Sequence, residues 1–119
     1  MPDLRTNSDL LPTARQEDDA VIGAIRGEIY LHNSPELRGA LIDLLTRNKP
    51  KKLILNLGLV PYMDSSAIAV LVETLQRLRK TGGKLYLTNL QPRVKGLLEI
   101  ARLDSIFVIA ADEQEAMKK

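Results

Sequence analysis

The sequence predicts an α/β fold in which a central mixed, mostly parallel sheet of about five strands is flanked by about four helices. Beyond residue 20, apolar runs of strand length alternate with amphipathic stretches of helical period. Such a succession makes neighbouring strands parallel and joins them by right-handed crossovers. The turn residues Glu17-Asp18-Asp19 add an expected hairpin near the N-terminus.

The composition indicates one aliphatic domain without cysteine chemistry. Of 119 residues, 45% are hydrophobic but only 3% aromatic, so the core must be built from aliphatic side chains. The absence of Cys excludes disulfides and thiolate zinc ligands. No apolar run approaches the length of a membrane span and no signal-peptide core is present, so we expect a cytoplasmic protein without membrane insertion. Residues 1–9 are expected to be a flexible segment and residues 10–119 one domain.

The first expected elements are two strands and a helix. Residues 10–16 predict an edge strand, where Pro12 is tolerated. Residues 20–31 predict a second strand, whose glycines permit a bulge. Ser34-Pro35-Glu36 predicts a helix start with Ser34 as the hydroxyl cap, and this helix should end near Asn48-Lys49-Pro50.

The clearest strand and helix lie in the middle of the chain. Residues 53–57 form a short apolar run, as expected of a strand covered on both faces. After a loop at residues 61–63, a helix begins at Asp64-Ser65-Ser66. Its apolar residues recur at helical spacing: Ile68, Leu71, Leu75 and Leu78. Thr81-Gly82-Gly83 ends this helix, because glycine accepts the left-handed conformation of a helix end.

Four further elements complete the expected chain. Residues 84–90 alternate in polarity and predict a strand, and Pro92 opens another helix. Residues 106–110 predict a last short strand, and residues 112–119 a terminal helix.

Two basic clusters stand out: Lys49, Lys51 and Lys52, and Arg77, Arg79, Lys80 and Lys84. They could form a patch for nucleic acid or lipid headgroups, or a solvated face that complements a helix dipole. No aromatic residues for base stacking are interleaved with them, and the formal net charge is only +2. The second interpretation is therefore favoured, and no nucleic-acid partner is expected.

Four motifs follow one another along the chain: Gly27-Glu28-Ile29, Ser34-Pro35-Glu36-Leu37-Arg38, Tyr62-Met63-Asp64-Ser65-Ser66 and Gly82-Gly83-Lys84-Leu85. Together they resemble the anti-sigma factor antagonist family, the free-standing STAS domains. The resemblance implies the STAS-type fold and a partner-switching function in transcription regulation. The antagonist binds a serine-kinase anti-sigma factor, which carries the ATP, so that a sigma factor is released. The kinase inactivates the antagonist by phosphorylating the first serine of the motif, and a phosphatase reverses this.

The resemblance implies that Ser65 is the phosphorylation site, with Asp64, Ser66 and Ala67 around it. The expected partner-binding residues are Glu28, Tyr30, Leu31, Ser34, Tyr62 and Met63. Tyr62, Met63 and Ala67 are expected to form an exposed apolar rim. A phosphate on Ser65 would meet unpaired N–H groups at the helix start. The alternative interpretation of Ser65 is a plain helix cap. Two positions depart from the family pattern: Tyr30 stands where Asp is usual, and Ala67 where Gly is usual.

Enzyme functions are not supported by the sequence. His32 is the only histidine and no Gly-x-Ser-x-Gly elbow occurs, so Ser65 has no predicted catalytic base. Gly82-Gly83-Lys84 enters a strand, whereas a phosphate loop opens a helix. No catalytic residue, metal site or cofactor is expected. Two other functions remain open: a structural STAS subunit of a signalling scaffold or lipid-transport complex, not phospho-switched, and a basic nucleic-acid module.

Overall fold

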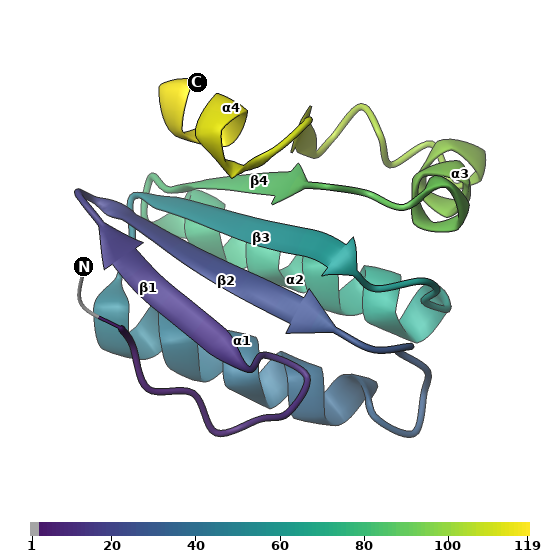
Figure 1. Ribbon diagram of the computed structural model, residues 1–119, viewed down its shortest axis with the longest axis horizontal. Helices are drawn as coiled ribbons and strands as arrows, with labels where there is room; N and C mark the ends of the chain where they lie inside the picture. The colour runs from purple at the N-terminus through teal and green to yellow at the C-terminus, as the bar shows by residue number, and fades with distance from the viewer. Residues whose placement is uncertain (1–2) are drawn as a thin grey trace.

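Within residues 3–119, which the computed structural model describes, five strands form one sheet in chain order (Figure 1). They are β1 (Thr13–Glu17), β2 (Ala20–Arg26), β3 (Lys52–Leu59), β4 (Lys84–Thr88) and β5 (Val108–Ala110). β1 and β2 pair antiparallel as a hairpin, and each later strand pairs parallel with the one before it. The predicted mixed, mostly parallel sheet is therefore confirmed.

Helices lie on both faces of this sheet. They are α1 (Ser34–Asn48), α2 (Ser65–Lys80), α3 (Pro92–Ile100) and α4 (Glu113–Lys118). α1 and α2 pack together on one face, α4 covers part of the other, and α3 lies beyond the end of β4 (Figure 1). Since side chains alternate along a strand, Leu53 and Leu55 of β3 face α1 and α2, whereas Ile54 packs with Ala116 of α4. No helix within residues 3–119 has the length and apolar character needed to cross a membrane.

The segment before β1, whose residues 1–9 are expected to be flexible, contacts the domain from residue 3 onward. The N–H of Leu4 donates to the carbonyl of Ala14 (2.8 Å) and extends the edge of the sheet. Leu11 is only 1% exposed, and Leu4 packs against the same core. These leucines anchor a stretch that looks polar on average. Residues 1 and 2 lie outside the described part of the chain.

The end of β2 prepares the site. β2 is shorter than the predicted strand of residues 20–31, and its pairing with β3 shifts register near its end. Gly27 (φ +93°) then turns the chain in a conformation that other residues rarely adopt. Ile29 makes one parallel bridge with Met63, its N–H donating to the carbonyl of Tyr62 (3.1 Å). This bridge holds the loop after β2 beside the loop after β3.

α1 begins one position away from the predicted cap. Ser34 is its first helical residue and is 4% exposed, whereas Asn33 occupies the N-cap position. The Asn33 side chain serves the preceding loop instead of the helix. Its Oδ1 accepts from the N–H of Tyr30 (2.7 Å) and its Nδ2 donates to the carbonyl of Glu28 (3.0 Å). The side-chain amide of Asn33 thus stabilises the loop after β2 through two hydrogen bonds to its backbone.

Candidate functional site

Ser65 is the first residue of α2, and its side chain is exposed. The chain leaves β3 through a turn closed by the N–H of Val60 and the carbonyl of Leu57 (3.0 Å). It then passes the bridge at Met63 and enters the helix. Ser65 therefore lies at the carboxyl edge of the parallel strands, the edge at which open α/β sheets bind ligands.

Asp64 caps α2 and ties two loops together. Its Oδ1 accepts from the N–H groups of Ser66 (2.9 Å) and Ala67 (3.3 Å), and from the hydroxyl of Ser66 (2.5 Å). Its Oδ2 accepts from the N–H of Leu31 (3.0 Å), in the loop after β2. These hydrogen bonds, led by that of the Ser66 hydroxyl, lower the pKa of Asp64 below its ordinary value. The carboxylate is therefore charged at neutral pH, and both of its oxygens accept hydrogen bonds from the protein.

The two adjacent serines are not equivalent. The hydroxyl of Ser66 donates to Asp64, whereas the Ser65 side chain is exposed and takes no part in the cap. The interpretation of Ser65 as a helix cap is wrong, because Asp64 makes the capping bonds. The expectation of free N–H groups for a phosphate is also wrong for Ser66 and Ala67, whose N–H groups Asp64 already occupies. Ser65 is thus the hydroxyl that can react without breaking the cap.

Aromatic side chains from both loops meet beside the helix start. The rings of Tyr30 and Tyr62 lie 5.6 Å apart, and His32 stacks on Tyr30 at 5.9 Å. The hydroxyl of Tyr30 donates to Oε1 of Glu28 (2.5 Å), a bond that raises the pKa of Tyr30. Arg93 of α3 lies over the Tyr62 ring, with Cζ 4.5 Å from its centre. Three aromatic rings, from Tyr30, His32 and Tyr62, thus lie together, with Glu28 and Arg93 in contact with them.

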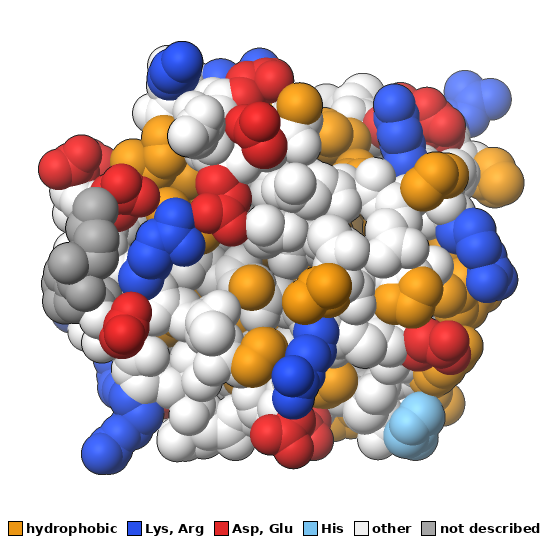
Figure 2. Space-filling model, viewed as in Figure 1, with side chains coloured by type: hydrophobic (Ala, Val, Ile, Leu, Met, Phe, Trp, Pro, Cys, Tyr) orange, Lys and Arg blue, Asp and Glu red, His pale blue; other side chains and the backbone are white. Residues whose placement is uncertain are grey.

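Sequence reasoning missed Arg93 and Leu59. Arg93 reaches the site from a helix that begins some thirty residues later, and no local pattern marks it. Leu59, at the end of β3, is 64% exposed, and Leu31 is 73% exposed. In Figure 2, apolar side chains gather along the right-hand side, where α3 and the loops after β2 and β3 lie in Figure 1. A surface with apolar and charged parts thus surrounds Ser65.

Three predicted surface residues are instead part of the core. Met63 and Ala67 are each 1% exposed, and Ser34 is 4% exposed. The expected exposed rim of Tyr62, Met63 and Ala67 is therefore wrong for the last two. Met63 is turned inward by its bridge with Ile29, and Ala67 lies on the inner side of the first turn of α2. These residues support the site from beneath.

The site offers a hydroxyl and hydrogen-bonding groups but no set of metal ligands. Among residues 3–119, no three His, Asp or Glu side chains come together in a way that could hold a metal ion. His32 stacks on Tyr30 and is exposed. The geometry leaves the Ser65 side chain exposed beside aromatic, apolar and charged groups of the neighbouring loops.

Comparison with known proteins identifies the family. The family model described as the STAS domain matches residues 12–116. A Bacillus subtilis anti-sigma-B factor antagonist is 33% identical over 100 residues, which cover 84% of this chain and 90% of that protein. A second Bacillus subtilis protein, provisionally named a sulfate transporter, is 38% identical over 86 residues. That match covers 71% of this chain but only 16% of the transporter.

A solved structure has the same fold along nearly its whole length. A Thermotoga maritima protein, provisionally described as an anti-sigma factor antagonist, superposes with a TM-score of 0.84 at 26% identity. The match covers 92% of this chain and 93% of that one. The chain therefore belongs to the STAS domain family, and it matches anti-sigma factor antagonists of that family along most of their length.

Proposed function

We infer that this protein is an anti-sigma factor antagonist that binds a serine-kinase anti-sigma factor in the cytoplasm and so releases a sigma factor. The kinase, which supplies ATP, phosphorylates Ser65 and ends binding, and a phosphatase restores it. The observation that carries this proposal is the exposed hydroxyl of Ser65 next to the engaged hydroxyl of Ser66. The match to the Bacillus subtilis anti-sigma-B factor antagonist along 90% of its length supports it.

The switch acts through charge in the interface. Phosphorylation adds about −1.5 to −2 charges. Asp64 beside it is already anionic, and its oxygens hold the first N–H groups of α2. The phosphate is therefore stabilised by the helix dipole but accepts few hydrogen bonds from the backbone, and it stays on the surface. α2 remains folded, while a partner that fits the unmodified surface meets a new charge that it must desolvate.

The partner surface consists of exposed and half-exposed groups around Ser65. Glu28, Tyr30, Leu31 and Tyr62 belong to it, and we add Arg93 because it lies on Tyr62. Interfaces of this kind are enriched in Tyr and Arg. Ser34 and Met63 act only by supporting the two loops, since both are buried.

A structural role is the second candidate. The 38% identity to a segment that makes up 16% of a provisionally named sulfate transporter indicates that domains of this kind also serve inside larger proteins. In that role the domain joins a scaffold or a lipid-transport complex and Ser65 is not phosphorylated.

Incubation with the kinase from the same cell separates the two candidates. That kinase is first isolated by pull-down with the unmodified protein, and the product formed with ATP is analysed by mass spectrometry. We expect one phosphate on Ser65, none in Ser65→Ala, and unchanged uptake in Ser66→Ala. A kinase that binds but leaves Ser65 unmodified, or a phosphate on Ser66, contradicts the switch. Capture of a transporter or a large homomeric assembly supports the structural role.

A further inference from the structure

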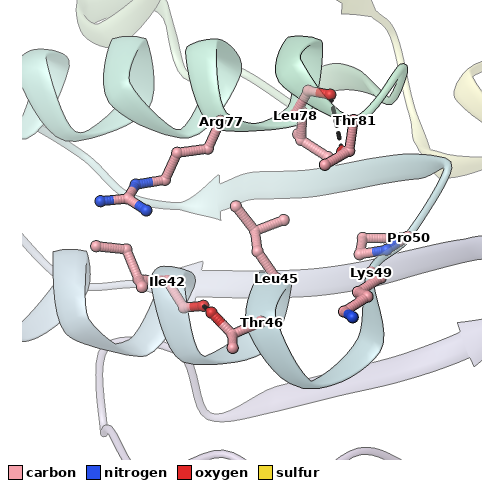
Figure 3. Close-up of a pocket in the computed structure, with 8 residues that line it drawn as sticks. All are labelled: Ile42, Leu45, Thr46, Lys49, Pro50, Arg77, Leu78 and Thr81. Atoms are coloured by element: carbon pink, nitrogen blue, oxygen red, sulfur yellow. Dashed lines mark hydrogen bonds between the residues drawn. The ribbon is translucent and has the colours of Figure 1, made fainter.

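An open pocket lies between the last turns of α1 and α2, at the opposite end of α2 from Ser65 (Figure 3). Its volume is about 370 Å³, within the range of small-molecule sites of roughly 300–1,000 Å³. Arg77, the first α2 residue that lines the pocket, lies about 18 Å along the helix axis from Ser65. The pocket therefore does not belong to the proposed partner surface.

The pocket has an apolar wall because some apolar side chains of α1 and α2 do not point into the core but line the space between the two helices. α1 directs Leu37, Leu41 and Leu44 into the core, which leaves Ile42 and Leu45 half-exposed on its side toward α2. Leu78 of α2 and Pro50 complete the apolar wall. Figure 3 shows Leu45 reaching from α1 into the space below α2. Hydrocarbon placed here would remove the half-exposed Ile42 and Leu45 from water and would pack on the buried Leu78 and Pro50.

The rim of the pocket is cationic. Its titratable lining residues are Lys49 and Arg77, and no carboxylate lines it. The guanidinium of Arg77 is paired with Glu73, since its Nε and Nη2 each lie 2.9 Å from Oε2 of that carboxylate. Lys49, in contrast, forms no ion pair within residues 3–119. Lys49 is the left-handed C-cap of α1 (φ 44°), so its backbone is fixed at the rim. An anion can pair with its ammonium without displacing an existing partner.

The two basic clusters of the sequence converge at this end of the molecule. The N–H of Lys84 donates to the carbonyl of Lys51 (3.0 Å), which brings the segment after α2 beside the segment after α1. Lys52 is the exception, because its Nζ donates to the carbonyls of Ala116 (3.0 Å) and Met117 (3.1 Å) at the end of α4. Of the two clusters, Lys49 and Arg77 line the pocket itself, and the other cations at this end of the molecule add to the positive potential that attracts anions.

We propose that this pocket binds a single-chain aliphatic anion, with its hydrocarbon chain against Ile42, Leu45 and Leu78 and its headgroup on Lys49. The apolar wall selects the chain and the cationic rim selects the charge. This ligand site goes beyond the proposed partner switching and does not depend on it.

Titration of the full-length protein with monomeric decanoate, followed by NMR of methyl groups, tests the proposal. We expect saturable shifts of the methyl groups of Ile42, Leu45 and Leu78, and weaker binding of decanol, which has the same chain without the charge. Absence of saturable shifts overturns the proposal. So do equal shifts at Ile100 and Ile106, exposed apolar residues elsewhere on the surface.

A matched pair of variants tests the headgroup contact. Lys49→Gln should weaken decanoate binding about 1.5-fold to fivefold, as the loss of an exposed ion pair does. Lys95→Gln removes the same charge from the exposed face of α3 and should leave the affinity unchanged. Equal effects of both variants overturn the assignment of Lys49. Binding to anionic phospholipid vesicles without binding of monomeric decanoate also overturns the proposal, because it indicates surface attraction without use of the pocket.

Discussion

Replacing Asp64 by Ala should destabilise the protein more than any single change of the neighbouring serines. The variant loses the cap on the N–H groups of Ser66 and Ala67, which is worth about 1 kcal/mol. It also loses the bond from the N–H of Leu31, which is worth about 1 kcal/mol more. We therefore expect a loss of about 2 kcal/mol in the free energy of unfolding. With a urea dependence of about 1–3 kcal/mol per molar, the midpoint falls by roughly 1 M.

Two matched variants give this experiment its controls. Ser65→Ala removes an exposed hydroxyl outside the cap and should change the free energy of unfolding by less than about 0.5 kcal/mol. Asp64→Asn keeps a capping oxygen and should lose less than Asp64→Ala, because Asn caps helices about as well as Asp. Urea unfolding followed by far-UV circular dichroism measures all three. If Ser65→Ala costs as much as Asp64→Ala, the assignment of the cap to Asp64 is refuted.

The same comparison has a defined pH dependence. The folded-state pKa of Asp64 is lowered from its ordinary value of 3.8, so the stabilisation is present above that pH and is lost as the pH falls through the folded-state pKa. The difference between the wild type and Asp64→Ala should therefore be constant near neutral pH and shrink below 3.8. A difference that grows in acid contradicts the role given to the carboxylate.

Three further predictions concern the surface and one ion-pair network. Ser65→Ala should bind the kinase partner constitutively and Ser65→Glu should bind it more weakly; equal affinities by calorimetry would argue against the switch. Tyr62→Asp should reduce partner affinity in a folded protein, whereas Met63→Asp should unfold the domain by burying a charge, which circular dichroism distinguishes. Two arginines lower the pKa of Glu73 to about 2, so the destabilisation caused by Glu73→Gln should be present above pH 4.5 and disappear as the pH falls toward 2. A destabilisation that persists in urea unfolding at the acid end would contradict that assignment.

The sequence predicts best where local pattern and tertiary environment agree. The apolar run of β3, interrupted only by Asn56, is buried on both faces. Gly82 (φ +78°) follows the end of α2 in the left-handed conformation that glycine at this position predicts. Hydrophobic periodicity and the positions of Gly and Pro depend only on residues close together in the sequence, so they can be recognised without knowledge of the fold. The succession of strands and helices is enough to give the parallel sheet.

Contacts between distant segments could not be predicted in this way. Met63 looks like an exposed loop residue, but its bridge to Ile29 turns its side chain inward. Ser34 has the sequence of a cap, yet Asn33 takes that position while its side chain closes the preceding loop. Arg93 joins the site only because the end of β4 places α3 beside the loop after β3. The directions of Met63 and Arg93 are decided by partners far away in the sequence, whereas the Asn33 side chain is held by residues three and five positions before it.

The two departures from the family pattern have different physical consequences. Ala67 in place of the usual Gly adds a methyl group on the inner side of α2, where it is 1% exposed and cannot obstruct a partner. Tyr30 in place of the usual Asp removes a carboxylate from the loop, but its hydroxyl is held by Glu28 (2.5 Å), whose side chain is exposed. A negative charge therefore remains at this edge of the sheet, presented by Glu28 and screened on one side by an aromatic ring. A partner cation that reaches this edge can pair with Glu28 and stack on Tyr30 together. Specificity among related kinases is then expected to depend on Tyr30, while access to Ser65 does not.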